Sequence, residues 1–408
     1  MGGQPEMDVI LLLFWVSVLA ILYVYLGYPV LVTLLARLRR PEVSSRQPWI
    51  PSLTILIAAY NEEGCIARKL ENTLALDYPR EKMQVIVVAD GSDDRTSEIV
   101  RDFGSRGVQL LHRPERRGKM DAINRAMEAA SGEIVVFSDA NNLYQPDALR
   151  ELVAPFADGR VGVVTGAKLV AADSSLLAAS EGLYWKYESF IKRKESRLGC
   201  CVAVAGEILA LRRVLFSPPP SRVINDDFFM AMDIARRGYR VVYASRARSV
   251  EPVSATARDE ITRRSRIVAG RIQAILLSPR LLTLRRPLVA WQVVSHKFMR
   301  PLVPFAMIGA LAANVVLVVW PPPAAVGIRG LAPPWNLAAL CCQGIFYGLA
   351  VVGTRLGKKG FLGKALYVPV YLVQSNLAAL LGIWGLLRGG STVVWKKVAR
   401  RDAGEFPG

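Results

Sequence analysis

The chain has 408 residues, 52% of them hydrophobic, and carries a formal net charge of +18. Its mean hydropathy of +0.28 is high for a soluble enzyme, and the apolar residues are concentrated at the two ends. The five cysteines form two adjacent pairs and a single residue, which argues against a disulfide framework and against a cysteine metal site. Many cations flank apolar segments, so we expect membrane lipid as an anionic partner and no nucleic acid.

A first apolar segment begins close to the start of the chain. Residues 9–36 contain no charged side chain, and about 20 apolar residues suffice to cross a bilayer. A cleaved signal peptide is the alternative, but Glu6 and Asp8 precede the segment and basic residues follow it. We predict an uncleaved anchor over residues 1–36, with its C-terminal side in the cytoplasm by the positive-inside rule. Residues 37–50 are predicted to form a linker.

Residues 51–280 alternate between apolar runs typical of buried strands and segments typical of helices. Strands are expected at TILIAAY, MQVIVVAD, VQLLHRP, EIVVFSDA and VGVVTGAKLV. This alternation predicts an α/β domain with a mainly parallel sheet and helices on both faces. Two nucleotide-binding folds are excluded. The turn AAYNEEG lacks the glycines of a dinucleotide site, and Arg113 stands where a P-loop ending at Gly118 and Lys119 needs its first glycine.

Residues 281–300 mix Leu, Trp291 and Phe298 with several Arg and Lys side chains. A basic amphipathic segment beside an apolar span is typical of a helix that lies among lipid headgroups. An ordinary surface helix is the alternative, and we favour the interfacial helix.

Three more apolar segments, 301–320, 335–354 and 365–387, predict a C-terminal transmembrane region over residues 301–390. The basic loop between the last two segments should be cytoplasmic. If the last segment crosses fully, the basic tail 391–408 lies outside, against the positive-inside rule. The last segment is then re-entrant or interfacial, or one span is miscounted. We favour a cytoplasmic tail.

Acidic motifs follow the predicted strands of the central domain. Asp90 in VADGSDDRT and Asp139 in FSDANNLY each come directly after an apolar strand, and Asp226 and Asp227 lie in a third motif, INDDFF. Ligands of open α/β sheets gather beyond the carboxyl ends of the strands. Carboxylates there suit a metal ion and a diphosphate, and those of the third motif suit a general base.

Seven motifs occur in order at a familiar spacing: AAYNEE, VADGSDDRT, RRGKMDAINRAM, FSDANNLYQPDAL, AGEILALRR, NDDFFMAMDIARRGYRVVY and RRSRIVAG. Over residues 50–275 they resemble the family 2 inverting glycosyltransferases of the GT-A fold. Specifically, they resemble the membrane-embedded branch that contains cellulose, hyaluronan and chitin-oligosaccharide synthases. The resemblance implies a GT-A domain, the fold of nucleotide-diphospho-sugar transferases, flanked by transmembrane helices.

The resemblance implies that the nucleoside of the donor lies at the ends of the first two strands. Ala59, Tyr60, Asn61 and Glu62 match the positions that hold the nucleobase, although these residues also suit a plain strand-end turn. Asp90 matches the aspartate that holds the uridine part of the donor. Its carboxylate can accept from ribose hydroxyls or from a base N–H.

The diphosphate is expected between a helix N-terminus and a metal ion. Lys119 opens a predicted helix, and its ammonium suits an anionic phosphate, with a solvated basic turn as the alternative. Asp139 and Asn141 occupy the D-x-D position, whose oxygen ligands suit Mg²⁺ or Mn²⁺. Asn141 supplies a neutral carbonyl oxygen, so we expect Asp139 to contribute most to metal binding.

The third motif is predicted to supply the base. Asp226 and Asp227 match the Glu-Asp pair of the family, whose second residue deprotonates the acceptor hydroxyl; a helix N-cap with an acidic first turn is the alternative. Arg266 is what remains of the Q-x-x-R-W motif of polymerising members and suits the leaving diphosphate. The Gln and Trp of that motif are absent, and Trp185 and Tyr187 are either another aromatic platform or ordinary core residues.

Together these features predict an integral membrane glycosyltransferase with a cytoplasmic catalytic domain. It would move a sugar with inversion from a nucleotide-diphosphate donor, expected to be UDP-linked, to a growing polysaccharide or glycan acceptor. One alternative is transfer of a single sugar to a lipid-linked acceptor, which Asn141 and the altered motif around Arg266 favour. The other is a non-catalytic, nucleotide-binding membrane subunit, against which the intact aspartates argue.

Overall fold

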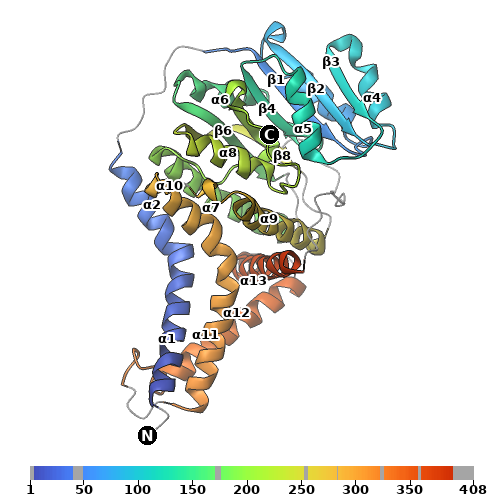
Figure 1. Cartoon of the computed structure of the whole chain (residues 1–408). Coiled ribbons are helices and arrows are strands. Elements are labelled where there is room, and N and C mark those ends of the chain that lie inside the picture. The colour runs from blue at the N-terminus through green and yellow to red at the C-terminus, as the bar shows by residue number, and fades with distance from the viewer. Residues whose placement is uncertain are drawn as a thin grey trace.

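The computed structural model describes residues 4–39, 49–170, 176–251, 256–282, 284–321, 326–356 and 360–388. The middle of the predicted linker and the whole of the predicted basic tail lie outside the described residues. A sheet with its covering helices forms one end of the molecule, and long helices extend from it to the N-terminus (Figure 1).

An eight-stranded sheet forms the centre of the described part of the catalytic domain, with the strand order β3-β2-β1-β4-β7-β6-β8-β5. The strands are β1 (Leu53–Ala59), β2 (Met83–Asp90), β3 (Val108–Arg113), β4 (Ile134–Asp139), β5 (Leu143–Tyr144), β6 (Val161–Val170), β7 (Leu209–Arg212) and β8 (Arg240–Glu251).

Parallel pairing brings the acidic strand ends together. β1 pairs in parallel with β2 and β4, β2 with β3, and β6 with β8, whereas β7 runs antiparallel to both its neighbours and β5 antiparallel to β8. In this register Ala59 lies opposite Ala89, and Ala58 lies opposite Asp139. Asp90 and Asp139 therefore end the two strands that flank the end of β1. The predicted α/β domain with a mainly parallel sheet is confirmed.

The central strands are apolar on both faces because helices cover both. One cluster contains Ile86 and Val135 with Ile123 of α5 (Lys119–Ala129), and the other contains Val87 and Val136 of the same strands. Continuous burial of this kind is typical of parallel strands. The second face is covered by α3 (Ile66–Leu74), α4 (Thr96–Asp102) and α6 (Ala148–Val153).

Three further helices link the sheet to the membrane region: α7 (Leu176–Leu198), α8 (Asp226–Arg236) and α9 (Ala257–Leu277). Helix α9 approaches the start of α8 closely at Gly270. A Cβ atom at Gly270 would lie 2.8 Å from the side chain of Ile224 and 3.1 Å from that of Asn225. Contacts this short leave no space for a side chain, so Gly270 allows α9 to pack on the loop that precedes Asp226.

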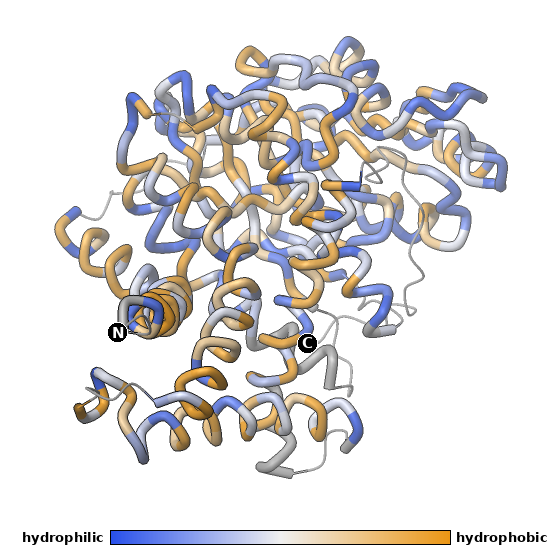
Figure 2. Tube along the Cα trace, turned by 60° about the horizontal axis from the view of Figure 1, so that its bottom comes forward, coloured by the Kyte–Doolittle hydropathy of each residue, from blue (hydrophilic) through white to orange (hydrophobic). Residues whose placement is uncertain are grey.

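Within the part of the chain that the structure describes, four helical segments are long and apolar enough to cross a membrane: Glu6–Arg37, Pro287–Val319, Trp335–Arg355 and Val368–Leu387. They indicate an integral membrane protein. The first joins α1 (Gln4–Leu22) to α2 (Tyr28–Arg37), and the second joins α10 (Pro287–Val293) to α11 (Met299–Val319). α12 (Trp335–Leu356) and α13 (Gly360–Leu387) provide the others. Figure 2 shows these helices as largely hydrophobic along their length.

Helix α13 packs against the catalytic domain, whereas α1 and α11 extend away from it (Figure 1). A Cβ atom at Gly382 would lie 2.4 Å from the backbone oxygen of Ser265 in α9. The Arg264 guanidinium donates to the Ser375 hydroxyl at 2.6 Å and lies 4.7 Å from the centre of the Tyr371 ring. Helix α13 thus packs on α9 through both backbone and side-chain contacts.

The segment predicted as an interfacial helix, residues 281–300, is different in the structure. It continues through a π-helical turn, Val294–Phe298, into α11, so that residues 287–319 form one helical stretch. Lys297 is buried, and Arg286 donates to the backbone oxygen of Ala235 at 2.7 Å. Lys297 and Arg286 therefore both contact groups of the protein.

A buried ion cluster connects the membrane helices to α7. The His296 ring lies between two carboxylates, with Nδ1 2.6 Å from Glu195 and Nε2 3.0 Å from Glu188. Arg300 pairs with Glu188 at 2.8 Å, and the Tyr28 hydroxyl donates to Glu195 at 2.5 Å. Buried charges are tolerated only when they are paired, so this cluster selects one arrangement of α2, α7 and α11.

Candidate active site

The Lys119 ammonium joins the acidic motifs of the sheet edge. Its Nζ lies 3.2 Å from Asp139 Oδ1, at the end of β4, and 3.4 Å from Asp226 Oδ2, in the first turn of α8. Burial disfavours the charged form of Lys119, yet the carboxylates of Asp139, Asp226 and Asp227 raise its pKa above the ordinary value. The predicted residues of three separate motifs therefore meet at one point, and Lys119 is a cation at that point.

Asp90 positions the loop that leads to Lys119. Its carboxylate accepts from the backbone N–H of Arg117 at 3.2 Å and of Gly118 at 2.7 Å. The next residue, Gly91, has a φ of +69°, and a Cβ atom there would lie 2.7 Å from the backbone nitrogen of Arg116. Only glycine fits a left-handed backbone conformation in so narrow a space. Asp90 therefore holds the loop before Lys119 in place, a role that its sequence motif did not predict.

The turn after β1 is tied to the loop after β2. Asn61 has a φ of +54°, and its side chain donates to Asp93 Oδ1 at 2.5 Å and accepts from the Asp93 N–H at 3.0 Å. The Glu62 N–H donates to the Thr96 hydroxyl at 2.7 Å. Asn61 and Glu62 thus contribute to a strand-end turn, as the alternative prediction had it. The guanidinium carbon of Arg116 lies over the Tyr60 ring, 3.5 Å from the ring centre.

The residues present fit an oxygen-coordinated divalent cation. Asp139 offers a carboxylate, and Asn141 Oδ1 is buried and has no hydrogen-bond partner among the described residues. An acceptor left unpaired in this way is expected for a ligand of a hard cation. No cluster of three His, Cys, Asp or Glu side chains that could hold a metal occurs in the described ranges. Two protein oxygens completed by substrate phosphates match the usual mode of Mg²⁺ binding.

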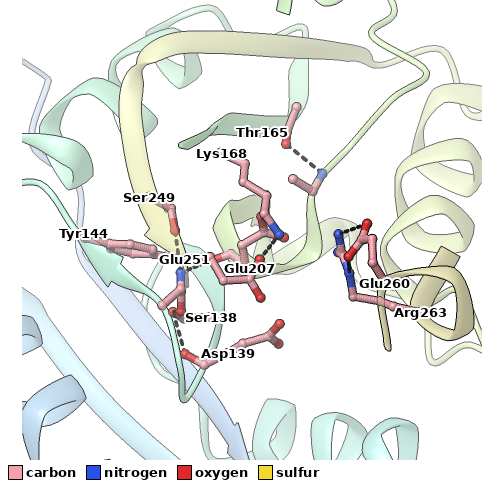
Figure 3. Close-up of polar contacts among 12 residues, drawn as sticks. Ser138, Asp139, Tyr144, Thr165, Lys168, Glu207, Ser249, Glu251, Glu260 and Arg263 are labelled. Atoms are coloured by element: carbon pink, nitrogen blue, oxygen red, sulfur yellow. Dashed lines mark hydrogen bonds and ion pairs between the residues drawn. The ribbon is translucent and has the colours of Figure 1, made fainter. Parts of the chain in front are cut away.

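Asn142 follows the proposed metal ligand Asn141 and makes hydrogen bonds through its side-chain nitrogen and through its oxygen atoms. Its amide nitrogen donates to the Glu207 backbone oxygen at 2.8 Å and to the Ser249 hydroxyl at 2.7 Å (Figure 3). Its oxygen atoms accept from Lys69 Nζ at 2.9 Å and 3.2 Å, and from the Ser138 hydroxyl at 3.2 Å. Lys69 is fully buried in α3, and burial lowers its pKa to about 7. Sequence reasoning missed Lys69 because nothing in its helical pattern distinguishes it from a solvated lysine.

The predicted base lies in the first turn of α8, which begins at Asp226. Asn225 is the N-cap residue, and Asp227 Oδ1 accepts from the Phe228 N–H at 2.7 Å. Burial and the charge of Asp226 raise the pKa of Asp227 to about 6. Gly206 lies against Asp227, and a Cβ atom there would be 3.3 Å from Asp227 Cβ. A carboxylate whose pKa is closer to neutrality is a stronger base.

Helix α9 brings Arg266 toward the same centre. Its side chain is largely buried, and the charges of Asp226 and Asp139 act on its guanidinium. The structure therefore gathers Arg266, Lys119 and the aspartates into one site.

Of the two aromatic residues considered as a sugar platform, Tyr187 donates a hydrogen bond from its hydroxyl to the Tyr25 backbone oxygen at 2.9 Å. Its ring packs against the apolar cluster that contains Tyr28 of α2 and Ile191 of α7. The centre of the Trp185 ring lies 5.5 Å from Lys168 Nζ. Glu207, in the motif AGEILALRR, was not predicted as a site residue from the sequence. The structure places it next to the site, because its neighbour Gly206 lies against Asp227.

Comparison with known proteins places these residues in a family. Residues 51–270, more than half of the chain, match the family model described as glycosyltransferase like family 2. The chain belongs to this family, and it is a family 2 glycosyltransferase. The predicted resemblance and the predicted enzyme class are confirmed.

Two curated relatives share one name, poly-beta-1,6-N-acetyl-D-glucosamine synthase. The protein of Staphylococcus aureus is 28% identical over 211 residues, which cover 50% of this chain and 50% of that protein. The protein of Staphylococcus epidermidis is 26% identical over 211 residues, which cover 50% of this chain and 51% of that protein. The chain thus spans about half the length of the curated relatives it matches.

A solved structure is similar over nearly the whole chain. It is a mannosyltransferase from Pyrobaculum calidifontis in complex with GDP-Man and Mn2+, with a TM-score of 0.66 and 26% sequence identity. The match covers 91% of this chain and 99% of that one. The similarity extends beyond the catalytic domain, because residues 51–270 alone account for little more than half of the chain.

The depressed pKa of Lys69 makes the stability of the protein depend on pH. Between pH 7 and its ordinary pKa of 10.5, Lys69 binds fewer protons in the folded than in the unfolded state, so the free energy of unfolding rises with pH in this window. Lys69→Met removes the contribution. We expect the unfolding midpoint of the wild type, relative to Lys69→Met, to increase from pH 7 to pH 10 in detergent solution. Lys186→Met, at an exposed lysine, is the control, and a pH-independent difference for Lys69→Met contradicts the prediction.

Proposed function

We propose that this protein transfers a sugar, with inversion, from a nucleotide-diphosphate donor to a growing polysaccharide or glycan acceptor at the cytoplasmic face of the membrane. One observation carries the proposal. The Lys119 ammonium lies within 3.4 Å of carboxylates from two motifs, next to the Asp227 carboxylate whose pKa is raised to about 6. This arrangement combines groups that bind a diphosphate and its metal with a group that accepts a proton.

The donor is held at the ends of β1, β2 and β4. The Tyr60 ring and Asp90 bind the nucleoside, while Lys119 and Arg266 neutralise the diphosphate as it leaves. Asp139 and Asn141 would hold Mg²⁺ or Mn²⁺, which would compensate the negative charge of the diphosphate. The similar mannosyltransferase structure, which contains Mn2+, supports a divalent cation here.

The acceptor hydroxyl loses its proton to Asp227. The oxygen then attacks the anomeric carbon from the face opposite the diphosphate, the bond to the diphosphate breaks, and the configuration inverts. Asp226 remains paired with Lys119 and raises the basicity of Asp227 through its charge. Burial is the larger cause of the raised pKa of Asp227, because a carboxylate in a low-dielectric site is less stable in its charged form.

Two donor classes are supported by different observations. The resemblance of Asp90 to a uridine-holding aspartate favours a UDP-sugar. The mannosyltransferase that matches most of the chain binds GDP-Man, which favours a guanosine donor. The curated relatives are named for a polymer of N-acetylglucosamine, which favours polymer synthesis over the transfer of a single sugar.

The cytoplasmic position of the catalytic domain is supported by charge. Arg37 closes α2, and Arg285 and Arg286 precede α10, at the helix ends that adjoin the catalytic domain (Figure 1). The far end of α1 carries Glu6 in its first turn. Basic residues concentrate on the cytoplasmic side of membrane proteins.

The test is release of the nucleotide diphosphate by the purified full-length chain, with Mg²⁺ or Mn²⁺, from a panel that includes UDP-N-acetylglucosamine, UDP-glucose and GDP-mannose. Release that requires one donor, together with incorporation of its sugar into a glycan, establishes the proposal and names the donor. Absence of release from every donor, in the presence of added glycan and lipid-linked acceptors, contradicts it.

Replacement of the base should separate chemistry from binding. Asp227→Asn keeps the shape of the side chain but cannot accept the proton, so we expect kcat to fall by about 10²–10⁴-fold. Nucleotide affinity, measured by calorimetry, should be unchanged because Asp227 does not contact the nucleoside in the proposed site. Asp233→Asn, on the same helix and paired with Arg236 and Arg237, is the matched control. Normal turnover by Asp227→Asn excludes it as the base.

The raised pKa of Asp227 predicts the acidic limb of the pH profile. Asp227 must be ionised to act as a base, so kcat/KM should fall as the pH drops through about 6. An ordinary aspartate, near 3.8, would retain full activity at pH 5. The measurement is kcat/KM for the donor between pH 4.5 and 8, and a profile that is flat down to pH 5 contradicts the assignment.

Removal of divalent cations should abolish turnover. Excess EDTA is expected to stop nucleotide release, and added Mg²⁺ or Mn²⁺ should restore it, because Asp139 and Asn141 supply too few protein ligands to retain the ion. EDTA presaturated with Mg²⁺ is the control for effects of the chelator itself. Full turnover in excess EDTA refutes the role given to Asp139.

A further inference from the structure

A buried cluster of charged side chains lies beside the proposed catalytic centre and has no part in the transfer as derived so far. Lys168 near the end of β6, Glu207 in the 3-10 turn Gly206–Ile208, and Glu251 at the end of β8 point toward one another (Figure 3). The Lys168 ammonium forms an ion pair with Glu251 and lies 3.7 Å from Glu207 Oε1. Their side chains are 6%, 5% and 12% exposed for Lys168, Glu251 and Glu207, so solvent does not compensate their charges.

Glu207 lies next to both halves of the catalytic site. Its neighbour Gly206 touches Asp227, since a Cβ atom at Gly206 would be 3.4 Å from Asp227 Oδ2. The backbone oxygen of Glu207 accepts from Asn142, which directly follows the proposed metal ligand Asn141. After burial, the charge of Asp139 is the main cause that raises the pKa of Glu207, which again indicates proximity. A group bound at Glu207 would therefore be adjacent to the reacting atoms.

Two polar atoms of this region are buried without a hydrogen-bond partner among the described residues: Glu207 Oε1 and Trp185 Nε1. The centre of the Trp185 ring lies 5.5 Å from Lys168 Nζ, so the ring that carries this N–H borders the charged cluster. Buried polar atoms are almost always hydrogen bonded. An unused acceptor and an unused donor together fit a ligand that can donate and accept, and sugar hydroxyl groups do both.

We propose that Glu207 binds a hydroxyl group of a pyranose ring in the active site, and that Lys168, held by Glu251, is the positioning residue that orients the Glu207 carboxylate. The indole N–H of Trp185 supplies a donor to the same ring. The ion pair of Lys168 with Glu251 fixes the ammonium beside Glu207, whose carboxylate can accept a hydrogen bond from a hydroxyl group. This inference rests on the proposed function and adds a specificity-determining residue to it.

The ring belongs either to the transferred sugar or to the acceptor, because both present the same hydroxyl chemistry at this position. The two sources are distinguished by analogues that lack one hydroxyl at a time. One series consists of monodeoxy versions of the sugar nucleotide that the wild type uses, and the other of monodeoxy acceptor glycans.

The experiment compares kcat/KM for each analogue and its parent in the full-length wild type, Glu207→Ala and Glu207→Gln. Loss of the hydroxyl that Glu207 binds should lower wild-type kcat/KM by about 10- to 100-fold and should have little further effect in Glu207→Ala. If this difference between the wild type and Glu207→Ala occurs with a deoxy donor, the ring belongs to the transferred sugar. If it occurs with a deoxy acceptor, the ring belongs to the acceptor. Both results support the proposal, and a purely structural role would not produce either.

Two further variants test the positioning role. Lys168→Met should reduce discrimination of the same hydroxyl, and Lys168→Arg should restore part of it, because a cation is again shared with Glu251. Glu133→Ala is the matched control. Glu133 is half-exposed, pairs with Arg212 and is distant in the sheet from the carboxyl-terminal edge, so it should leave discrimination unchanged.

Folding of the Glu207 variants is not expected to limit the test. The bonds from Asn142 and from the Tyr144 hydroxyl, at 2.8 Å each, go to the Glu207 backbone oxygen and remain after a side-chain replacement. Wild-type turnover with equal discrimination of every hydroxyl in wild type and Glu207→Ala overturns this inference alone. Absence of wild-type turnover with all donors overturns the proposed function, and this inference with it.

Discussion

Most of the catalytic architecture depends on the compensation of negative charge at one edge of the sheet. Parallel strands deliver Asp90 and Asp139 to this edge, and the first turn of α8 adds Asp226 and Asp227. Carboxylates repel one another strongly in a partly buried site, where the effective dielectric constant is low. Lys119 makes the arrangement stable, because its ammonium is shared by β4 and α8. The position of Lys119 depends in turn on Asp90, which binds the backbone N–H groups just before it.

The same electrostatic principle joins the catalytic domain to the membrane region. His296 and Arg300 contact the two α7 carboxylates Glu188 and Glu195, and Arg300 cannot separate from Glu188 without leaving a buried ion unpaired. Helix α9, which carries Arg266, is held between the loop before α8 and helix α13. The group proposed to bind the diphosphate is therefore positioned by a helix that packs against the membrane region, and not by the sheet alone.

The relatives agree on the chemistry and differ on the substrates. The match to curated polysaccharide synthases covers half of each chain, whereas the match to the mannosyltransferase structure extends over nearly all of both. The cluster proposed to bind a sugar ring, Lys168, Glu207 and Glu251, is separate from Tyr60 and Asp90, which are proposed to bind the nucleoside.

The sequence by itself determined the class of the catalytic fold and the main acidic residues of its site. Apolar runs of strand length, each followed by an aspartate, reflect local burial and the geometry of parallel sheets, and both leave a direct pattern in the chain. The sequence did not reveal that Lys69 is buried beneath Asn142, that Glu207 faces the site, or that α13 packs on α9. Those features depend on pairings between residues far apart in the chain. A buried lysine and a solvated one look alike in a sequence, and only the tertiary structure decides which one has lost its water.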